Sequence, residues 1–161
     1  LPSLVPERRP RIAAYGGRVY IMWSEHDPED PGAGRAIRLV QATAEGSVVG
    51  GIRTLAEAAH PVDLIELSAN RRGVFVLYGE EVDPEGPYDQ PGHSRLVLHH
   101  LDFDGAPVSQ PHEIETSRLA YYAGLAARGL DNPEGVLLSW AAHTEAGRDE
   151  IHIGRLHCAT P

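Results

Sequence analysis

One pattern occurs three times along the chain. In each copy a glycine leads into four or five mostly apolar residues, which end in an aromatic residue followed by small or acidic ones. The copies are GRVYIMWSE (17–25), GVFVLYGE (73–80) and GVLLSWAA (135–142), so the aromatic residues Trp23, Tyr78 and Trp140 are 55 and 62 residues apart. Runs of this kind, bounded by Gly and acidic loop residues, predict strands buried on both faces. The chain is therefore expected to repeat one β-structural unit.

Each predicted strand has apolar segments before and after it. One precedes it, at 11–15, 62–67 and 119–125, and one follows it after a polar loop, at 36–46, 94–105 and 150–157. Weaker candidates for a further strand lie at 52–55 and 112–114. Two of the segments end in Glu45-Gly46 and Asp104-Gly105, where a Gly that can take a positive φ predicts a hairpin turn. The pattern therefore indicates four strands in each copy.

Four antiparallel strands in each repeat of about 55–60 residues are typical of a propeller blade. The prediction is an all-β chain of three four-stranded antiparallel propeller-type blades in a single domain, 1–161. The approximate repeats are 10–58, 59–116 and 117–161, and residues 1–9 are a candidate for the last strand of an incomplete blade. The alternative is an α+β fold, because 53–60, 63–72 and 117–129 contain good helix formers.

The segments VYIMWSE with AIRLVQATAEG, and VLLSWAA with EIHIGRLH, resemble the repeats of bacterial β-propellers. In that family a W-S-acidic strand end precedes a hairpin of the RLD-x-DG type. Its members include secreted repeat proteins, sialidase-like propellers and propeller lectins. The resemblance implies the fold, leaves the activity open and favours an extracytoplasmic or secreted location. The S-x-D-x-G-x-T-W box of sialidases is absent from the sequence.

Composition restricts the partners. The chain has 14 basic and 23 acidic residues and a net charge of -9, so it lacks the positive field that nucleic acid requires. No run approaches the ~18 apolar residues of a membrane span. The single cysteine, Cys158, excludes an internal disulfide and a four-cysteine zinc site. We therefore expect no nucleic acid partner and no membrane span.

The candidate binding residues lie in the loops that follow the three aromatic strands, at 26–34, 81–93 and 143–149. Binding residues often lie on loops held by a rigid scaffold, and an aromatic tip such as Tyr88 offers contact area together with a hydroxyl group. Oxygen-rich loops can bind Ca²⁺, but none of these follows the D-x-D-x-D-G spacing, so no cofactor is expected. The predicted binding residues are Tyr88, Asp27, Glu29, Asp30, Asp83, Glu85 and Asp89.

Motifs for catalysis and metal binding gain no support. The nine histidines include His99 and His100, but neighbours on a strand point to opposite faces, so these two cannot bind one ion without a bulge. Signatures of a nucleophilic serine or cysteine are absent, as are phosphate-binding glycine loops. Trp23, Tyr78 and Trp140 are interpreted as core residues rather than as a stacking platform for sugars. No catalytic or metal-binding residue is predicted.

The resulting hypothesis is a non-catalytic binding or interaction module that presents loops of one propeller face to a protein or a glycan. The alternatives are a fragment of a sialidase-like glycoside hydrolase and a structural subunit of a larger assembly. Three blades are fewer than the ~4 to 8 of a closed propeller, which leaves two blade faces uncovered. The expected partner is therefore another copy, or another chain, that completes the propeller.

Overall fold

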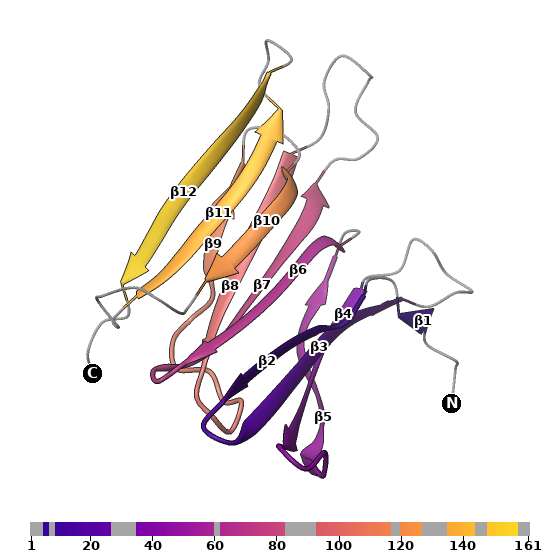
Figure 1. The fold of residues 1–161 in the computed structure, drawn as a ribbon. Helices are drawn as coiled ribbons and strands as arrows, with labels where there is room; N and C mark the ends of the chain where they lie inside the picture. The colour runs from indigo at the N-terminus through magenta and orange to yellow at the C-terminus, as the bar shows by residue number, and fades with distance from the viewer. Residues whose placement is uncertain are drawn as a thin grey trace.

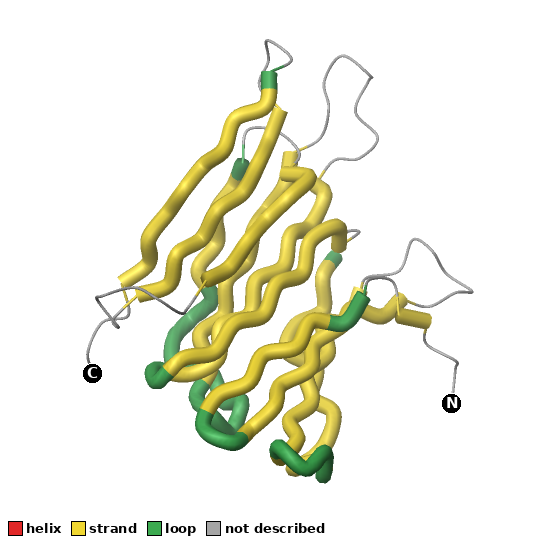
Figure 2. The backbone as a smooth tube through the Cα atoms, in the orientation of Figure 1, coloured by secondary structure: helices red, strands yellow, loops and turns green. Residues whose placement is uncertain are grey.

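The computed structural model describes residues 5–6, 9–26, 35–59, 62–82, 93–116, 120–126, 135–143 and 148–157. This part of the chain is all-β, without a helix, and forms antiparallel sheets (Figures 1 and 2). It accordingly contains no helix that could cross a membrane. The predicted propeller-type blades are confirmed, and the α+β alternative is wrong.

Three sheets follow one another along the chain, and each is one blade. Blade one consists of β2 (Arg11–Tyr15), β3 (Arg18–His26), β4 (Arg35–Thr43) and β5 (Val48–Ala58). Blade two consists of β6 (Val62–Asn70), β7 (Gly73–Val82), β8 (His93–Leu101) and β9 (His112–Glu115). Blade three has three described strands, β10 (Ala120–Ala126), β11 (Gly135–His143) and β12 (Asp149–His157). In every blade each strand pairs with the next one in sequence.

The segments rich in helix formers are strands. Residues 53–58 belong to β5, 63–70 to β6, and 120–126 to β10. In β6 the residues Ile65, Leu67 and Ala69 alternate with partly exposed ones, and all three enter the buried cluster between blades one and two. This period of two fits a pleated strand, and packing outweighs the intrinsic helix preference.

The N-terminal segment pairs within blade one. Val5 and Pro6 form β1, which pairs with His26 and Glu25 of β3, while β2 pairs with the rest of the same edge. These two residues thus lie on the same edge of β3 as β2. The rest of 1–8 lies outside the described residues, as do residues 158–161 with Cys158.

The three sheets pack face to face and fan out from their first strands. β6 contacts β2 on one side and β10 on the other, and these three innermost strands run in the same direction (Figure 1). One cluster of buried side chains fills the space between blades one and two, and a second fills the space between blades two and three. Blade two is therefore covered on both faces, whereas blades one and three are each covered on one face.

The three aromatic residues occupy equivalent positions. Trp23, Tyr78 and Trp140 lie on the second strand of their blades, opposite Arg38, Val97 and His152. Tyr78 is buried against blade one, and Trp140 packs half-buried against the cluster shared with blade two. Trp23 is the exception to the predicted core role. It points to the face of blade one that blade two does not cover, so it is only half-buried.

Candidate binding surfaces

The predicted binding residues lie outside the described residues, which end at His26 and Val82 and resume at Arg35 and His93. This applies to Tyr88, Asp27, Glu29, Asp30, Asp83, Glu85 and Asp89. The strands that lead into 27–34, 83–92 and 144–147 are β3, β7 and β11, and they run in the same direction through three neighbouring sheets (Figure 1). The chain therefore leaves all three blades at one end, which we call the loop end.

At the loop end of blade one an acidic side chain is held by two donors. Arg38 Nε donates to Glu25 Oε2 at 2.8 Å, and Trp23 Nε1 donates to Glu25 Oε1 at 2.7 Å. Arg38 also donates to the Thr54 hydroxyl on β5. Burial acts to raise the pKa of Glu25, but the hydrogen bonds from Arg38 and Trp23 outweigh it and lower this pKa. Glu25 is therefore an ionised structural group on the uncovered face of blade one.

Blade two has a more deeply buried version of this arrangement. Glu80 stands two residues after Tyr78, as Glu25 stands two after Trp23, and its side chain is 2% exposed. Arg95, directly opposite on β8, donates through Nη2 to Glu80 Oε2 at 2.7 Å. This hydrogen bond raises the pKa of Arg95, while burial, followed by the charge of Glu80, raises the pKa of Tyr78 to about 12. The acidic residues after the aromatic positions thus neutralise arginines across the sheet.

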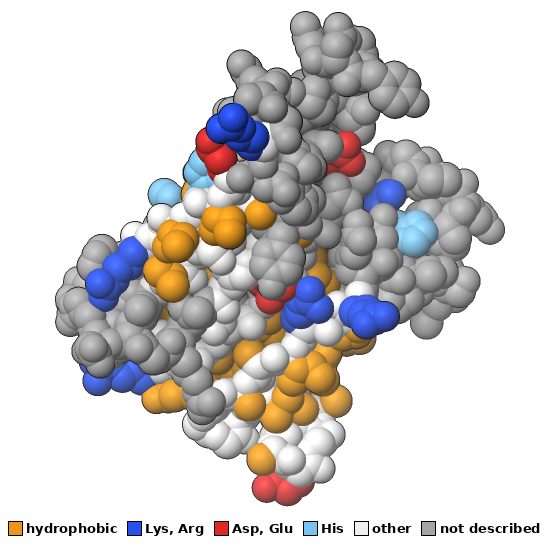
Figure 3. Space-filling view, turned by 45° about the horizontal axis from the view of Figure 1, so that its top comes forward, with side chains coloured by type: hydrophobic (Ala, Val, Ile, Leu, Met, Phe, Trp, Pro, Cys, Tyr) orange, Lys and Arg blue, Asp and Glu red, His pale blue; other side chains and the backbone are white. Residues whose placement is uncertain are grey.

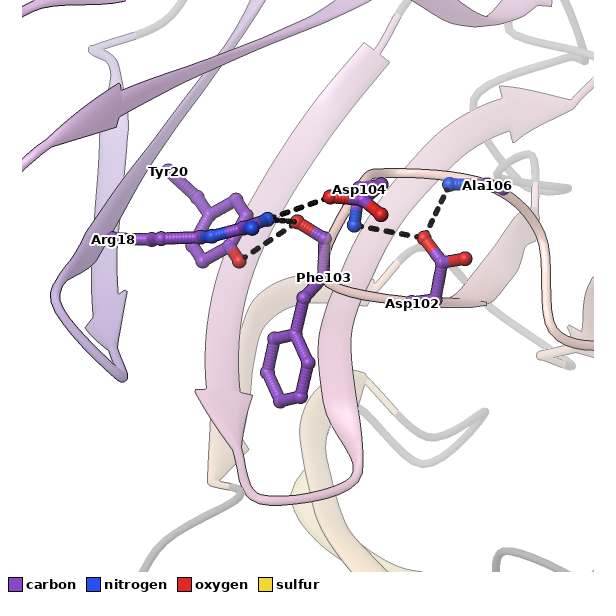
Figure 4. A network of polar contacts seen from close by, with 6 residues as sticks. All are labelled: Arg18, Tyr20, Asp102, Phe103, Asp104 and Ala106. Atoms are coloured by element: carbon purple, nitrogen blue, oxygen red, sulfur yellow. Dashed lines mark hydrogen bonds and ion pairs between the residues drawn. The ribbon is translucent and has the colours of Figure 1, made fainter. Parts of the chain in front are cut away.

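The opposite end of the blades carries two tight hairpin turns of one kind. In blade two, Asp102 Oδ1 accepts hydrogen bonds from the amides of Asp104 and Ala106, and Gly105 has a φ of 82° (Figure 4). In blade one, the amide of Gly46, with a φ of 89°, donates to the carbonyl of Thr43. A positive φ favours glycine at both turns, as the Glu45-Gly46 and Asp104-Gly105 pairs predicted.

The turn of blade two docks on blade one. Arg18 Nη1 donates to the Phe103 carbonyl and to Asp104 Oδ1, both at 2.7 Å, and the Tyr20 hydroxyl donates to the same carbonyl at 3.1 Å (Figure 4). The hydrogen bond to Asp104 raises the pKa of Arg18. Burial raises the pKa of Tyr20, although Arg18 opposes this. These contacts fix the relative position of two blades at their turn end.

A shallow hollow of about 240 Å³ lies beside this junction and is lined by Tyr15, Gly16, Arg18 and Phe103. The rings of Tyr15 and Phe103 stack at 5.6 Å between centroids with an interplanar angle of 9°. Arg18 is directed at Phe103 and Asp104 on the turn, so its main contacts are within the protein. The hollow lies at the turn end, opposite the loop end. Its residues Arg18 and Phe103 hold blade two against blade one.

One ion pair joins the innermost strands. Arg11 of β2 contacts Glu66 of β6, with Nε and Nη2 each 3.1 Å from Glu66 Oε1, and Nε also donates to the Ile65 carbonyl at 3.0 Å. Burial raises the pKa of Glu66 and outweighs the effect of Arg11. The sialidase-like alternative would need several arginines that converge with a carboxylate and a tyrosine in one pocket. In the described part of the chain, Arg11 is the arginine that contacts Glu66, and the two side chains join β2 to β6.

The neighbouring residues His99 and His100 on β8 point to opposite faces of the sheet, as expected for adjacent residues on a strand. The ring of His99 stacks on Tyr78 at 5.7 Å, and that of His100 stacks on Phe75 at 4.6 Å, on the other face of the sheet. Burial lowers the pKa of His99. Among the described residues no three His, Cys, Asp or Glu side chains are grouped so that they could hold a metal ion.

No protein-family model and no curated protein matches the chain. It is similar to a solved structure described as a GH43 endo-arabinanase from Bacillus licheniformis, with a TM-score of 0.34 and 10% sequence identity. The similarity covers 92% of this chain and 72% of the enzyme. Likeness at this level does not assign the chain to the family of that enzyme.

Sequence reasoning missed the residues that join the blades. Arg18 and Arg11 were not singled out, and each reaches a partner 54 to 86 residues away. Neither lies in a motif. The available signal was the D-x-D-G turn at 102–105, because an Asp that caps its own turn leaves the carbonyl after it free to accept a hydrogen bond from elsewhere.

Proposed function

We propose that this chain is a non-catalytic binding module that presents the loops 27–34, 83–92 and 144–147 to a protein or a glycan. The observation that carries the proposal is the common loop end, because β3, β7 and β11, the described strands that precede these three segments, all end at the same end of three packed sheets. A rigid scaffold that brings loops together in this way is a common platform for recognition. By sequence, two of these segments contain the predicted acidic binding residues and one contains Tyr88, and an aromatic side chain is a frequent anchor in protein interfaces.

The titratable groups of the strands support this proposal over a hydrolase fragment. Glu25 and Glu80 each accept a hydrogen bond from an arginine, which ties their charge to the structure of their blades. A general acid needs a carboxyl group that can hold and release a proton toward a substrate. The sialidase-like hydrolase remains the alternative, and a purely structural subunit is the third candidate.

We further propose that the module works as part of a larger ring of blades. The support is that, among the described residues, no blade packs on one sheet face of blade one and of blade three, and that both faces carry exposed apolar side chains. Hydrophobic side chains reach the surface on both the blade-one and the blade-three side of the molecule (Figure 3). Large exposed apolar patches commonly mark interaction surfaces.

The test uses a glycan array, with and without Ca²⁺, and an assay for released reducing ends on the glycans that bind. We expect binding without release, and at least tenfold weaker binding in Tyr88→Ala. Val108→Ala is the matched control, because Val108 is an exposed apolar residue on the connection from β8 to β9 at the turn end. Release of reducing ends would favour the hydrolase, and equal loss of binding in both variants would contradict a binding surface at the loop end.

A further inference from the structure

The two uncovered sheet faces correspond to the two sides of the interfaces already present within the chain. We call the sheet face turned toward the next blade in sequence the following face, and the face turned toward the previous blade the preceding face. Each internal interface packs the following face of one blade on the preceding face of the next. Because Arg38, Val97 and His152 oppose the three equivalent aromatic residues, the residues that flank them on β4, β8 and β12 are also equivalent. Side chains can therefore be compared position by position.

The following face of blade three has the composition of an interface, but no described residue outside the blade is packed on it. Its residues Ile151 and Ile153 are 76% and 69% exposed. The equivalent pairs are Ile37 with Leu39 in blade one and Leu96 with Leu98 in blade two, and none of these four is more than 6% exposed. The same two positions hold large aliphatic residues in all three blades. In two blades they are buried by the next blade, and in the third they face outward.

The preceding face of blade one shows the complementary situation. On the second strand, Val74 and Val76 of blade two and Val136 and Leu138 of blade three have no exposed surface. Their equivalents in blade one are Val19 and Ile21, which are partly exposed and lie beside the half-buried Trp23. On the first strand, Leu67 is 8% exposed, whereas its equivalent Ile12 is 65% exposed.

We propose that a second copy of this chain covers both faces, with blade three of each copy packed on blade one of the other, so that two copies form a closed ring of six blades. The proposal rests on the proposed function, of which it specifies the assembly. The chain itself carries both halves of the interface, so one identical partner satisfies both uncovered faces. Packing like face on like face would reproduce neither internal interface. Six blades fall within the ~4 to 8 of closed propellers.

The first experiment measures the mass in solution by light scattering and sedimentation. The wild-type protein is expected at twice the 17.5 kDa of one chain. Ile153→Arg, on the following face of blade three, and Ile21→Arg, on the preceding face of blade one, should each give monomers. Val108→Arg is the matched control, because it places the same charge at an exposed position away from both faces, and it should remain a dimer.

Mixing the two monomeric variants tests the orientation. A head-to-tail pair of Ile21→Arg with Ile153→Arg retains one unaltered interface, so the mixture should recover a dimer, weaker than the wild type. In a dimer that pairs blade three with blade three, or blade one with blade one, only the substitution on that blade would give a monomer. Mixing the two variants would then not return this monomeric variant to a dimer. Either of these results, a wild-type monomer, or a mass well above two copies would overturn the proposal.

Trp23 supplies a readout that does not depend on mass. The chain has two tryptophans, so Trp140→Phe leaves Trp23 as the only one. Its emission should shift to shorter wavelength as protein concentration rises and blade one becomes covered, and Ile153→Arg in the same background should abolish the shift. Circular dichroism of each variant checks that it is folded. A monomer that still binds through the loop of Tyr88 would refute the ring while leaving the binding module intact.

Discussion

Arg18 and Phe103 are 85 residues apart in sequence, and Arg18 Nη1 lies 2.7 Å from the Phe103 carbonyl. The contact joins the start of β3 to the turn after β8, so it links blade one to blade two. The Tyr20 hydroxyl donates to the same carbonyl. A single backbone oxygen thus receives two donors from the neighbouring blade, and the two donors should act together.

Removing the donors one at a time and together tests this relationship. Tyr20→Phe should lower the free energy of unfolding by about 0.5–1.5 kcal/mol, because it deletes one hydrogen bond of a buried side chain. Arg18→Met should lower the melting temperature. The double variant should lose more than the sum, since the carbonyl then has neither donor, and a double-mutant cycle by chemical denaturation measures this coupling. Arg9→Met, at an exposed residue before β2, is the control. Strict additivity would contradict the shared role.

Two glycines with a positive φ should differ sharply in their tolerance of alanine. A Cβ at Gly46 would meet no atom within 4 Å, so Gly46→Ala should cost only the backbone strain of about 1–2 kcal/mol. A Cβ at Gly73 would lie 2.1 Å from the Leu101 carbonyl oxygen, so the strand backbone must shift. Gly73→Ala should therefore cost about 3 kcal/mol or more once ~1–3 kcal/mol of overpacking is added. Equal losses in urea denaturation would contradict the close approach of β7 and β8 at Gly73.

The glycine-led strands show why so much of the fold could be predicted. Gly73, Tyr78 and Glu80 are close in sequence, and their types alone indicate a turn, a buried strand and a strand end. The helix formers in 63–70 gave an ambiguous signal because local preference does not contain the neighbouring sheets that bury Ile65 and Leu67. Long-range contacts such as Arg11 with Glu66 depend on which strands become neighbours, which no local pattern encodes.

The binding site was predicted less completely, for a physical reason. A strand is indicated by its pattern of burial, whereas a binding loop is defined by what it contacts, so Tyr88 could be chosen only for its chemistry and its place between two strands. The exposure of Trp23 was not foreseen for a related reason. Trp23 and Tyr78 stand in the same pattern, an apolar run led by glycine and followed by a small and an acidic residue, and what distinguishes them is that no described blade precedes the blade of Trp23.

The ion pair of Glu80 and Arg95 should show that removing one partner lowers the free energy of unfolding more than removing both. Glu80→Ala should destabilise the protein by roughly 1–3 kcal/mol, because it leaves the Arg95 guanidinium without its carboxylate, although Arg95 is itself only partly buried. Replacing both by Leu should restore a large part of this loss, since no charge is then left unpaired. Chemical denaturation of the two single variants and the double variant gives the comparison. A double variant as unstable as Glu80→Ala would show that shape, and not charge, sets the cost.

The last prediction concerns pH and His99. This residue is 8% exposed, its ring stacks on Tyr78, and its Nε2 has no hydrogen-bond partner among the described residues. Burial lowers its pKa from the ordinary 6.5, so below that pH the unfolded chain binds a proton that the folded protein resists. Its contribution to stability is therefore complete above pH 6.5 and is lost as the pH falls through the lower pKa of the folded state.

His99→Phe keeps an aromatic ring against Tyr78 and removes the titration, so it isolates this effect. The free energy of unfolding should fall less between pH 8 and pH 5 in the variant than in the wild type, because the carboxyl groups that also titrate are common to both. An NMR titration of the His99 ring should independently give a pKa below 6.5. An identical pH dependence in the two proteins would show that folding does not lower the pKa of His99 and would contradict its burial away from water.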